Sequence, residues 1–123
     1  MSKEALKQRT KQFALRVMKM VEALPATKAA DVIGRQILRS ATSVAANYRS
    51  ACKARSPADF ISKITVVEEE ADETLLWLEL ISEAGLIKQE SLQELLKEAD
   101  ELTAIFTASG KTARTNQTTR KAG

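Results

Sequence analysis

Two stretches, RSATSVAANYR (residues 39–49) and EEEADETLLWLEL (residues 68–80), lie in two long runs of helical spacing. The first run covers residues 31–55 and the second covers residues 59–84. Ser56 and Pro57, between them, are typical of a helix start, because serine caps free amide groups and proline fits the first helical position. The two runs therefore predict a helical hairpin, and the rest of the chain is organised around it.

Two further helices flank the hairpin. Apolar residues recur every three or four positions over residues 6–24 and again over residues 92–106, which is the period of one helix face. Pro25 ends the first of these runs, because the residue before a proline is disfavoured in helical geometry. Gly85 and Gly110 follow the last periodic residues of the third and fourth runs, where glycine commonly ends a helix.

The overall fold follows from these four segments. Four amphipathic helices with short connections predict an all-α, antiparallel up-down-up-down four-helix bundle over residues 1–110. Residues 111–123 contain no large apolar side chain. We therefore expect a disordered basic C-terminal tail there, since such a segment has little to bury.

Composition narrows the class of protein. The chain has 123 residues, so it forms one domain, and with 44% hydrophobic but only 4% aromatic residues its core must be mainly aliphatic. A single cysteine, Cys52, excludes an internal disulfide and fits a reducing compartment. Residues 1–12 lack the apolar core of a signal peptide, and no run is long enough to span a bilayer. We expect a cytoplasmic protein that does not bind membranes.

Charge is sorted along the chain. Residues 25–56 carry six Lys/Arg against one Asp/Glu, whereas residues 57–84 carry one against eight. Residues 1–24 and the tail are again basic. A basic surface of this kind suits an anionic polymer, although most charged helix faces are simply solvated. The residues that we predict to contact phosphates are Arg9, Lys11, Arg16, Lys19, Lys111 and Arg114.

The hairpin brings a basic arm against an acidic one. Antiparallel pairing about the turn places Arg39 near Asp72 and Glu73, Ser43 near Glu69, and Arg35 near Trp77. Arginine forms two-pronged hydrogen bonds with carboxylates, so we expect a salt-bridge network that sets the register of the two helices. The predicted network comprises Arg35, Arg39, Ser43, Asn47, Glu69, Asp72 and Glu73.

The second arm is also apolar around much of its circumference. A helix needs only one apolar stripe to join a core, so this surplus favours a subunit interface over an unusually wide internal core. The residues off the main stripe, which we predict to form an oligomer interface, are Ile61, Leu76, Trp77 and Leu80.

The hairpin also carries a resemblance to a known family. The matching residues are QILRSATSVAAN (residues 36–47), Arg49, Arg55-Ser56, Asp59-Phe60 and VEEEADETL (residues 67–75). They resemble the four-helix-bundle proteins encoded by intervening sequences in bacterial large-subunit ribosomal RNA genes. The resemblance implies an antiparallel bundle that assembles into a homopentameric ring. It also implies kinship with the accessory protein of diversity-generating retroelements, a pentameric barrel that binds nucleic acid and reverse transcriptase.

Three functions are compatible with these features. The first is a non-enzymatic homo-oligomer, a pentamer by the resemblance, that binds RNA, DNA or a nucleoprotein partner through the first two helices and the tail. The second is a protein-interaction scaffold without nucleic acid. The third is a magnesium-dependent all-α nucleotide pyrophosphohydrolase, because the chain has carboxylate pairs similar to those of that enzyme class. Carboxylates three residues apart share a helix face and could hold magnesium through their oxygens. The three pairs with this spacing are Glu69/Asp72, Glu70/Glu73 and Glu98/Glu101.

We favour the non-enzymatic function. The chain contains no histidine, which removes the commonest general base and a common transition-metal ligand. An acidic face paired with arginines explains the carboxylate spacing more simply than a metal site does. We therefore expect no catalytic residue, no metal and no cofactor.

Overall fold

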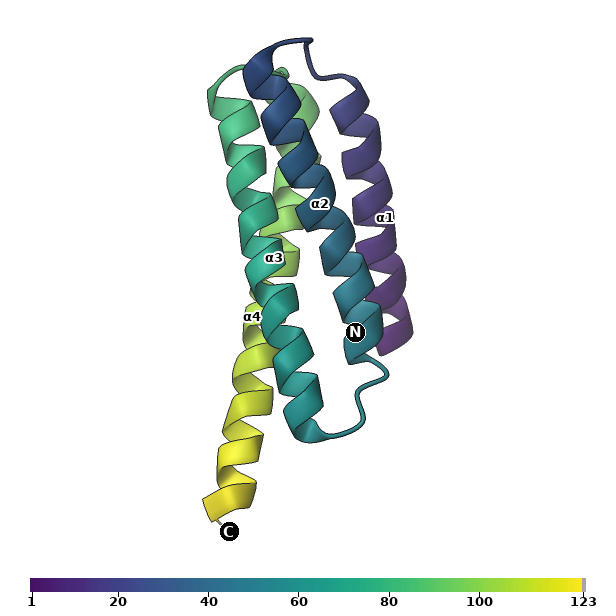
Figure 1. The fold of residues 1–123 in the computed structure, drawn as a ribbon, viewed down its shortest axis with the longest axis vertical. Coiled ribbons are helices and arrows are strands. Elements are labelled where there is room, and N and C mark those ends of the chain that lie inside the picture. The colour runs from purple at the N-terminus through teal and green to yellow at the C-terminus, as the bar shows by residue number, and fades with distance from the viewer. Residues whose placement is uncertain (123) are drawn as a thin grey trace.

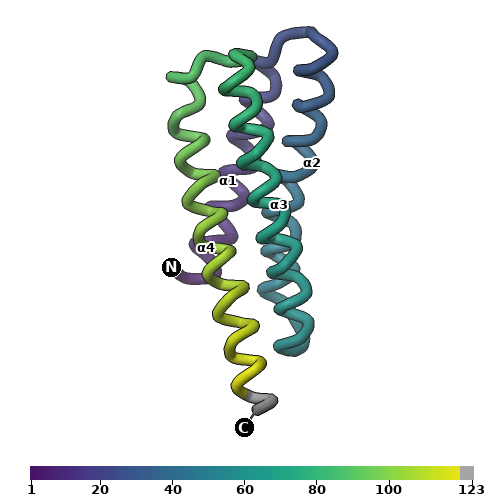
Figure 2. The backbone as a smooth tube through the Cα atoms, turned by 90° about the vertical axis from the view of Figure 1, so that its left-hand side faces the viewer, coloured from purple at the N-terminus to yellow at the C-terminus, as the bar shows by residue number. Residues whose placement is uncertain are grey.

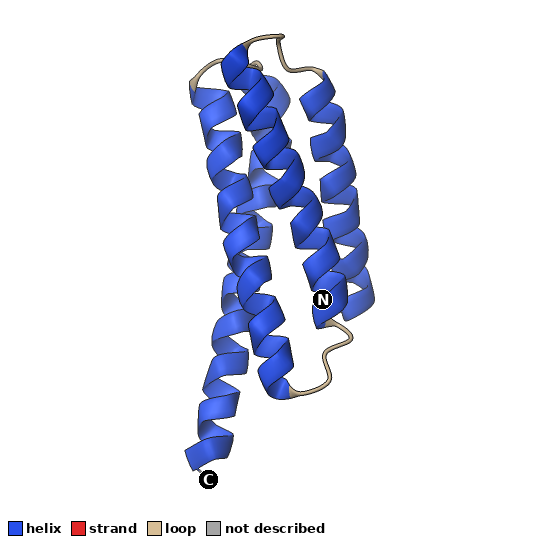
Figure 3. Ribbon diagram, viewed as in Figure 1, coloured by secondary structure: helices blue, strands red, loops and turns tan. Residues whose placement is uncertain are grey.

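The computed structural model describes the backbone of residues 1–122 and the side chains of residues 1–119. It contains the helices α1 (Lys3–Glu22), α2 (Lys28–Ala51), α3 (Pro57–Glu83) and α4 (Gln89–Ala122). No strand occurs among the described residues (Figure 3). The prediction of an all-α fold is confirmed.

The connections alternate between the two ends of the bundle. The α1–α2 and α3–α4 connections lie at one end, and the α2–α3 turn lies at the other (Figure 1). Successive helices therefore run antiparallel, in the predicted up-down-up-down order. Packing is extensive between α2 and α3 and between α3 and α4, and it is sparse between α1 and α4.

Local capping chemistry fixes where three of the helices begin. The hydroxyls of Ser2, Thr27 and Ser56 accept hydrogen bonds from backbone amides three residues later, at 3.1, 3.2 and 3.0 Å respectively. Asp59 in turn accepts from the backbone amide of Arg55 at 3.1 Å. This bond and the Lys63 ammonium hold the pKa of the Asp59 carboxyl below its usual range. The short turn of the hairpin is thus set by its own side chains.

The end of α3 depends on a glycine. Gly85 has φ +69°, a conformation that other residues adopt only with strain. This left-handed turn lets the amide of Leu86 bond to the carbonyl of Ile81 at 3.0 Å, which closes the helix. Gly85 therefore ends α3, as expected.

The core is aliphatic, and the described side chains include one aromatic pair within it. Tyr48 and Phe106 pack at 5.3 Å between ring centroids, with their planes tilted by 47°. Around them lie the largest fully buried aliphatic side chains, drawn from all four helices: Val17, Ile37, Val44, Ile64, Val67, Leu78, Ile81, Leu92 and Leu102. These residues occupy the apolar stripes that the sequence spacing defines.

The last helix is longer than expected. The prediction that it ends at Gly110 is wrong, because α4 runs through Gly110 to Ala122. The expected disordered tail is corrected in the same way for residues 111–122, whereas Gly123 lies outside the described residues. Arg114 explains the continuation, since its guanidinium donates to Glu68 of α3 at 3.1 Å. In Figure 2 the end of α4 projects beyond the α2–α3 turn.

No helix within residues 1–122 has the length and apolarity needed to cross a bilayer.

One arginine clamp joins α1 to α4 across their sparse seam. Arg9 donates from Nε and Nη2 to the two oxygens of Glu98, at 2.7 and 2.6 Å. Nη2 also donates to Glu101 at 2.6 Å. The hydrogen bonds to Glu98 raise the pKa of the Arg9 guanidinium above its ordinary value. The clamp supplies polar contacts where few apolar contacts exist.

Replacing Arg9 by glutamine is expected to lower the free energy of unfolding by roughly 1 to 2 kcal/mol, because the part-buried Glu98 loses its partner. Thermal unfolding followed by circular dichroism measures the change. Arg16→Gln is the matched control, since Arg16 is exposed on the same helix and has no ion pair within the described residues. Equal melting temperatures for the two variants would contradict a role for the clamp.

Tyr48 is expected to limit stability at high pH. Burial, and then the hydrogen bond with Cys52, raises the pKa of its phenol. The unfolded chain therefore ionises first, so stability is intact below about pH 10 and is lost as the pH rises further. Because Tyr48 is the sole tyrosine, phenolate absorbance should appear together with the loss of helical circular dichroism. Tyr48→Phe should weaken this alkaline transition, and phenolate formation in the folded protein would refute the argument.

Candidate functional site: the groove between α1 and α2

The predicted phosphate-binding residues are divided among several surfaces. Arg9 is bound in the α1–α4 clamp, and Arg114 is bound to Glu68. Arg16 and Lys19 line a groove between α1 and α4 that also contains Glu94. The structure therefore does not gather the six predicted residues on one face. Lys111 is exposed on the last helix, and Lys11 lines a different groove.

That groove lies between α1 and α2 and has a volume of about 290 Å³. Three cations line it, with no carboxylate among the lining residues. The other described grooves contain either opposite charges or a single cation. We call this surface the basic groove, and it is lined by Lys7, Lys11, Ala14, Leu15, Thr42, Ala45, Ala46 and Arg49.

Helical spacing places these side chains. Lys7 and Lys11 are one turn apart on α1, and small residues one turn apart on α2 form the facing wall. Lys7 is paired with Glu4 of its own helix at 2.6 Å. Lys11 and Arg49 are both exposed and form no ion pair within the described residues. The free cationic groups of the groove are therefore those of Lys11 and Arg49.

Sequence reasoning missed Lys7 and Arg49 as members of one surface. Both are basic residues on helices that were expected to carry positive charge. Only the packing of α1 on α2 shows that position 49 lies across from positions 7 and 11. Helical wheels of α1 and α2 show which basic residues share a face of each helix, but they do not show which faces of the two helices pack together.

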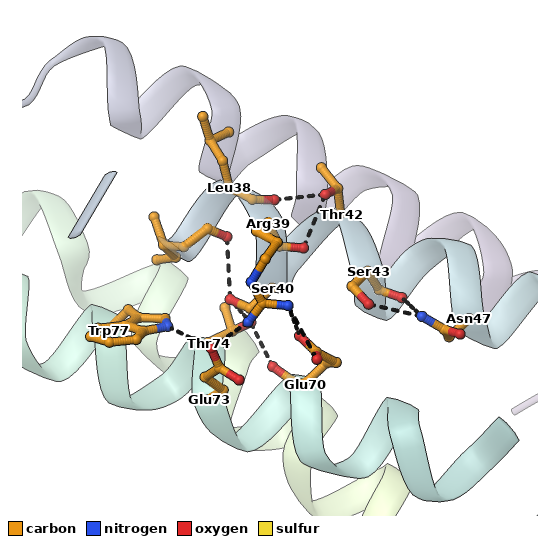
Figure 4. A network of polar contacts seen from close by, with 11 residues as sticks. Leu38, Arg39, Ser40, Thr42, Ser43, Asn47, Glu70, Glu73, Thr74 and Trp77 are labelled. Carbon is orange, nitrogen blue, oxygen red and sulfur yellow. Dashed lines mark hydrogen bonds and ion pairs between the residues drawn. The ribbon is translucent and has the colours of Figure 1, made fainter. Parts of the chain in front are cut away.

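A polar network ties α2 to α3 (Figure 4). Arg39 donates from Nη1 to Glu70 at 3.0 Å and from Nη2 to Glu73. Hydrogen bonding to Glu73, and then to Glu70, raises the pKa of the Arg39 guanidinium. Trp77 also donates to Glu73, at 3.3 Å from Nε1. The predicted pairing of Arg39 with Glu73 is present, and Glu70 takes the place expected for Asp72.

A buried hydrogen bond lies next to this network. The hydroxyls of Ser40 and Thr74 are 2.8 Å apart, and both residues are fully buried. Two small hydroxyl side chains let the helix backbones approach closely while satisfying one another. Sequence analysis placed neither residue in the network, because serine and threonine are equally common on exposed faces.

The other members of the predicted network lie elsewhere. Arg35 pairs with Asp31 of its own helix at 3.1 Å, and it has no ion pair with α3 among the described side chains. Ser43 accepts a hydrogen bond from Asn47 Nδ2 at 2.8 Å, within α2, and has no hydrogen bond to Glu69. Glu69 and Asp72 are exposed and form no ion pair among the described side chains.

The predicted oligomer-interface residues differ in exposure. Leu76 and Leu80 are 47% and 39% exposed, whereas Ile61 and Trp77 are half-buried. The register that pairs Arg39 with Glu73 places Val32 opposite Leu80, and Val32 is 51% exposed. Val32, Leu76 and Leu80 are large apolar side chains in contact with solvent, and we call them the apolar patch.

Arginines hold two of the three carboxylate pairs that were considered for magnesium. Arg39 binds Glu70 and Glu73, and Arg9 binds Glu98 and Glu101. A guanidinium occupies the oxygens that a cation would need. Within the described residues, no group of three or more acidic, cysteine or histidine side chains has a geometry suited to a metal ion.

Comparisons with known proteins agree with this fold. The model of the 23S rRNA-intervening sequence protein family matches residues 3–108. A crystal structure of a protein of unknown function from the S23 ribosomal protein family of Bacteroides thetaiotaomicron is similar, with a TM-score of 0.81 and 33% identity. The alignment covers 90% of this chain and 99% of that one. A comparison with curated proteins found no match. The chain therefore belongs to the 23S rRNA-intervening sequence protein family.

Proposed function

We propose that this protein is a non-enzymatic homo-oligomer that binds nucleic acid through the phosphate backbone. The observation that carries the proposal is the basic groove, in which Lys7, Lys11 and Arg49 converge without a lining carboxylate. Phosphate contacts by lysine and arginine supply most of the sequence-independent affinity of proteins for nucleic acid. The groove sits on the first two helices, where the sequence concentrates positive charge.

The shape of the groove favours backbone contacts over contacts with bases. Lys7 and Lys11 lie about 6 Å apart along the helix axis, so they can follow one strand while Arg49 binds from the other side. No aromatic residue lines the groove, and Tyr48 is buried in the core. Bases therefore have no ring on which to stack, and little sequence preference is expected. RNA and DNA share the phosphate chemistry that this surface recognises.

The double variant Lys11→Glu/Arg49→Glu is expected to weaken binding to a labelled nucleic-acid duplex by at least about tenfold at low salt. It should also make the salt dependence shallower by roughly one unit of slope for each lost phosphate contact. Fluorescence anisotropy, as a function of salt concentration, measures both quantities for RNA and DNA duplexes.

The matched control is Lys88→Glu/Lys97→Glu, which makes the same change of charge at two exposed lysines outside the basic groove. This control should bind within about twofold of the native protein, because it changes net charge without touching the groove. Equal losses of nucleic-acid affinity in the two double variants would show that net charge, and not the basic groove, accounts for binding. No binding by the native protein at low salt would end the proposal.

Assembly is the second part of the proposal. The apolar patch exposes three large aliphatic side chains on adjoining helices, which is unfavourable in a monomer and typical of an interface. The family resemblance favours a ring of five chains. The ring would repeat the basic groove around its circumference, so each copy would add phosphate contacts and raise overall affinity.

Leu76→Glu/Leu80→Glu is expected to reduce the mass in solution from that of an oligomer to that of the monomer, because two charges cannot be buried in an apolar interface. Sedimentation velocity measures the mass. Thr107→Glu, an exposed position on α4, is the control and should leave the mass unchanged. A native protein that sediments as a monomer, or a double variant with unchanged mass, would contradict assembly through the apolar patch.

A further inference from the structure

The largest described groove has no part in the function proposed above. It has a volume of about 650 Å³ and lies where the α2–α3 turn meets the last turns of α4. The α2–α3 hairpin contributes the apolar residues Ala51, Ala54, Pro57 and Phe60 to its lining, and we call these four residues the floor. We call the groove itself the end groove. Its size is that of a binding cleft.

One wall of the end groove is the C-terminal part of α4. Ala108, Thr112, Ala113 and Asn116 lie on one helix face and line the groove. Part of this wall projects past the α2–α3 turn, as Figure 2 shows for the end of α4. Side chains at positions 112, 115, 118 and 119 are threonines, which are poor helix formers. A projecting helix of this composition gains stability when something packs against it.

Glu68 of α3 holds this part of α4 in place. Gly110 is buried against the Glu68 carboxylate, and a methyl group on Gly110 would overlap it. The missing side chain thus admits Glu68 into contact with α4. Glu68 then accepts from Arg114 Nη1 at 3.1 Å, and the same nitrogen lies 3.4 Å from the Thr65 hydroxyl. Gly110, which was expected to end the helix, instead allows α4 to pack against Glu68 of α3.

The charges around the end groove are predominantly positive. Among the described side chains, Lys3 is the one charged residue in its lining. Lys53, Arg55 and Lys111 are exposed beside lining residues in the sequence. Glu4, beside Lys3, is also exposed but is paired with Lys7. The nearest carboxylate in the turn, Asp59, is already bound by the Arg55 amide and the Lys63 ammonium. An occupant should therefore bring acceptors or negative charge to the rim and apolar groups to the floor.

We propose that the end groove binds an amphipathic helix of a partner protein, with an apolar stripe flanked by carboxylates. A nucleic acid fits less well, because phosphate binding depends on several cations in a row, and phosphates gain nothing from contact with an apolar floor. Helix-in-groove recognition uses this combination of apolar floor and charged rim. The proposal does not rest on nucleic-acid binding by the basic groove, and either can fail alone.

Two synthetic helical peptides test the proposal on the full-length protein. Both carry the same leucine stripe, which is flanked by glutamates in one peptide and by lysines in the other. The acidic peptide should bind, with amide chemical-shift changes at Ala108, Thr112 and Ala113, and the basic peptide should bind at least about tenfold more weakly. Equal binding of both peptides, absence of binding, or shifts confined to the basic groove would overturn the proposal.

Matched variants locate the binding site. Ala108→Glu places a carboxylate in the groove and should weaken the acidic peptide at least about tenfold relative to Thr107→Glu, which adds the same charge at an exposed position outside the lining. Arg114→Gln should also weaken binding and reduce helicity at the C-terminus, whereas Arg114→Lys should retain most of both. Equal affinities for Ala108→Glu and Thr107→Glu would contradict the site. A nucleic-acid duplex that displaces the peptide and shifts the same amides would assign the groove to nucleic acid instead.

Discussion

The contact between α2 and α3 sets the register on which the rest of the bundle depends. Arg39 bridges Glu70 and Glu73, and one position further along the buried hydroxyls of Ser40 and Thr74 bond to each other. A shift of either helix by one residue would break the bond between the two hydroxyls, leaving each with only a carbonyl of its own helix, and it would separate the arginine from its carboxylates. Apolar packing alone tolerates such shifts more easily, so the polar contacts select one arrangement.

Much of this architecture could be predicted from the sequence. Ser56, Pro57 and Gly85 act within a few residues of themselves, so their local chemistry sufficed to place the ends of α3. Partners across the bundle were harder to predict. Five acidic residues lie between positions 68 and 73, and register alone cannot distinguish Glu70 from Asp72 as the partner of Arg39. The continuation of α4 through Gly110 depends on Glu68 from another helix, which no local pattern reveals.

The candidate site could likewise be predicted only in part, because it also depends on contacts between helices. Charge counting correctly found the basic helices, but it did not separate cations bound by carboxylates from cations open to a ligand. Arg9 and Arg114 stabilise the bundle, while Lys11 and Arg49 are exposed beside the basic groove. An arginine whose guanidinium is bound to carboxylates of another helix is not available to bind phosphates. The electrostatic surface is therefore smaller, and more localised, than the net charge implies.

The sparse seam between α1 and α4 has a consequence for motion. Because α1 packs mainly on α2, it can detach in a local opening that leaves the other three helices together. Amide hydrogens of α1 should then exchange with solvent before those of α3. Since α1 supplies one wall of the basic groove, any ligand held there would close this opening and slow exchange throughout the first helix.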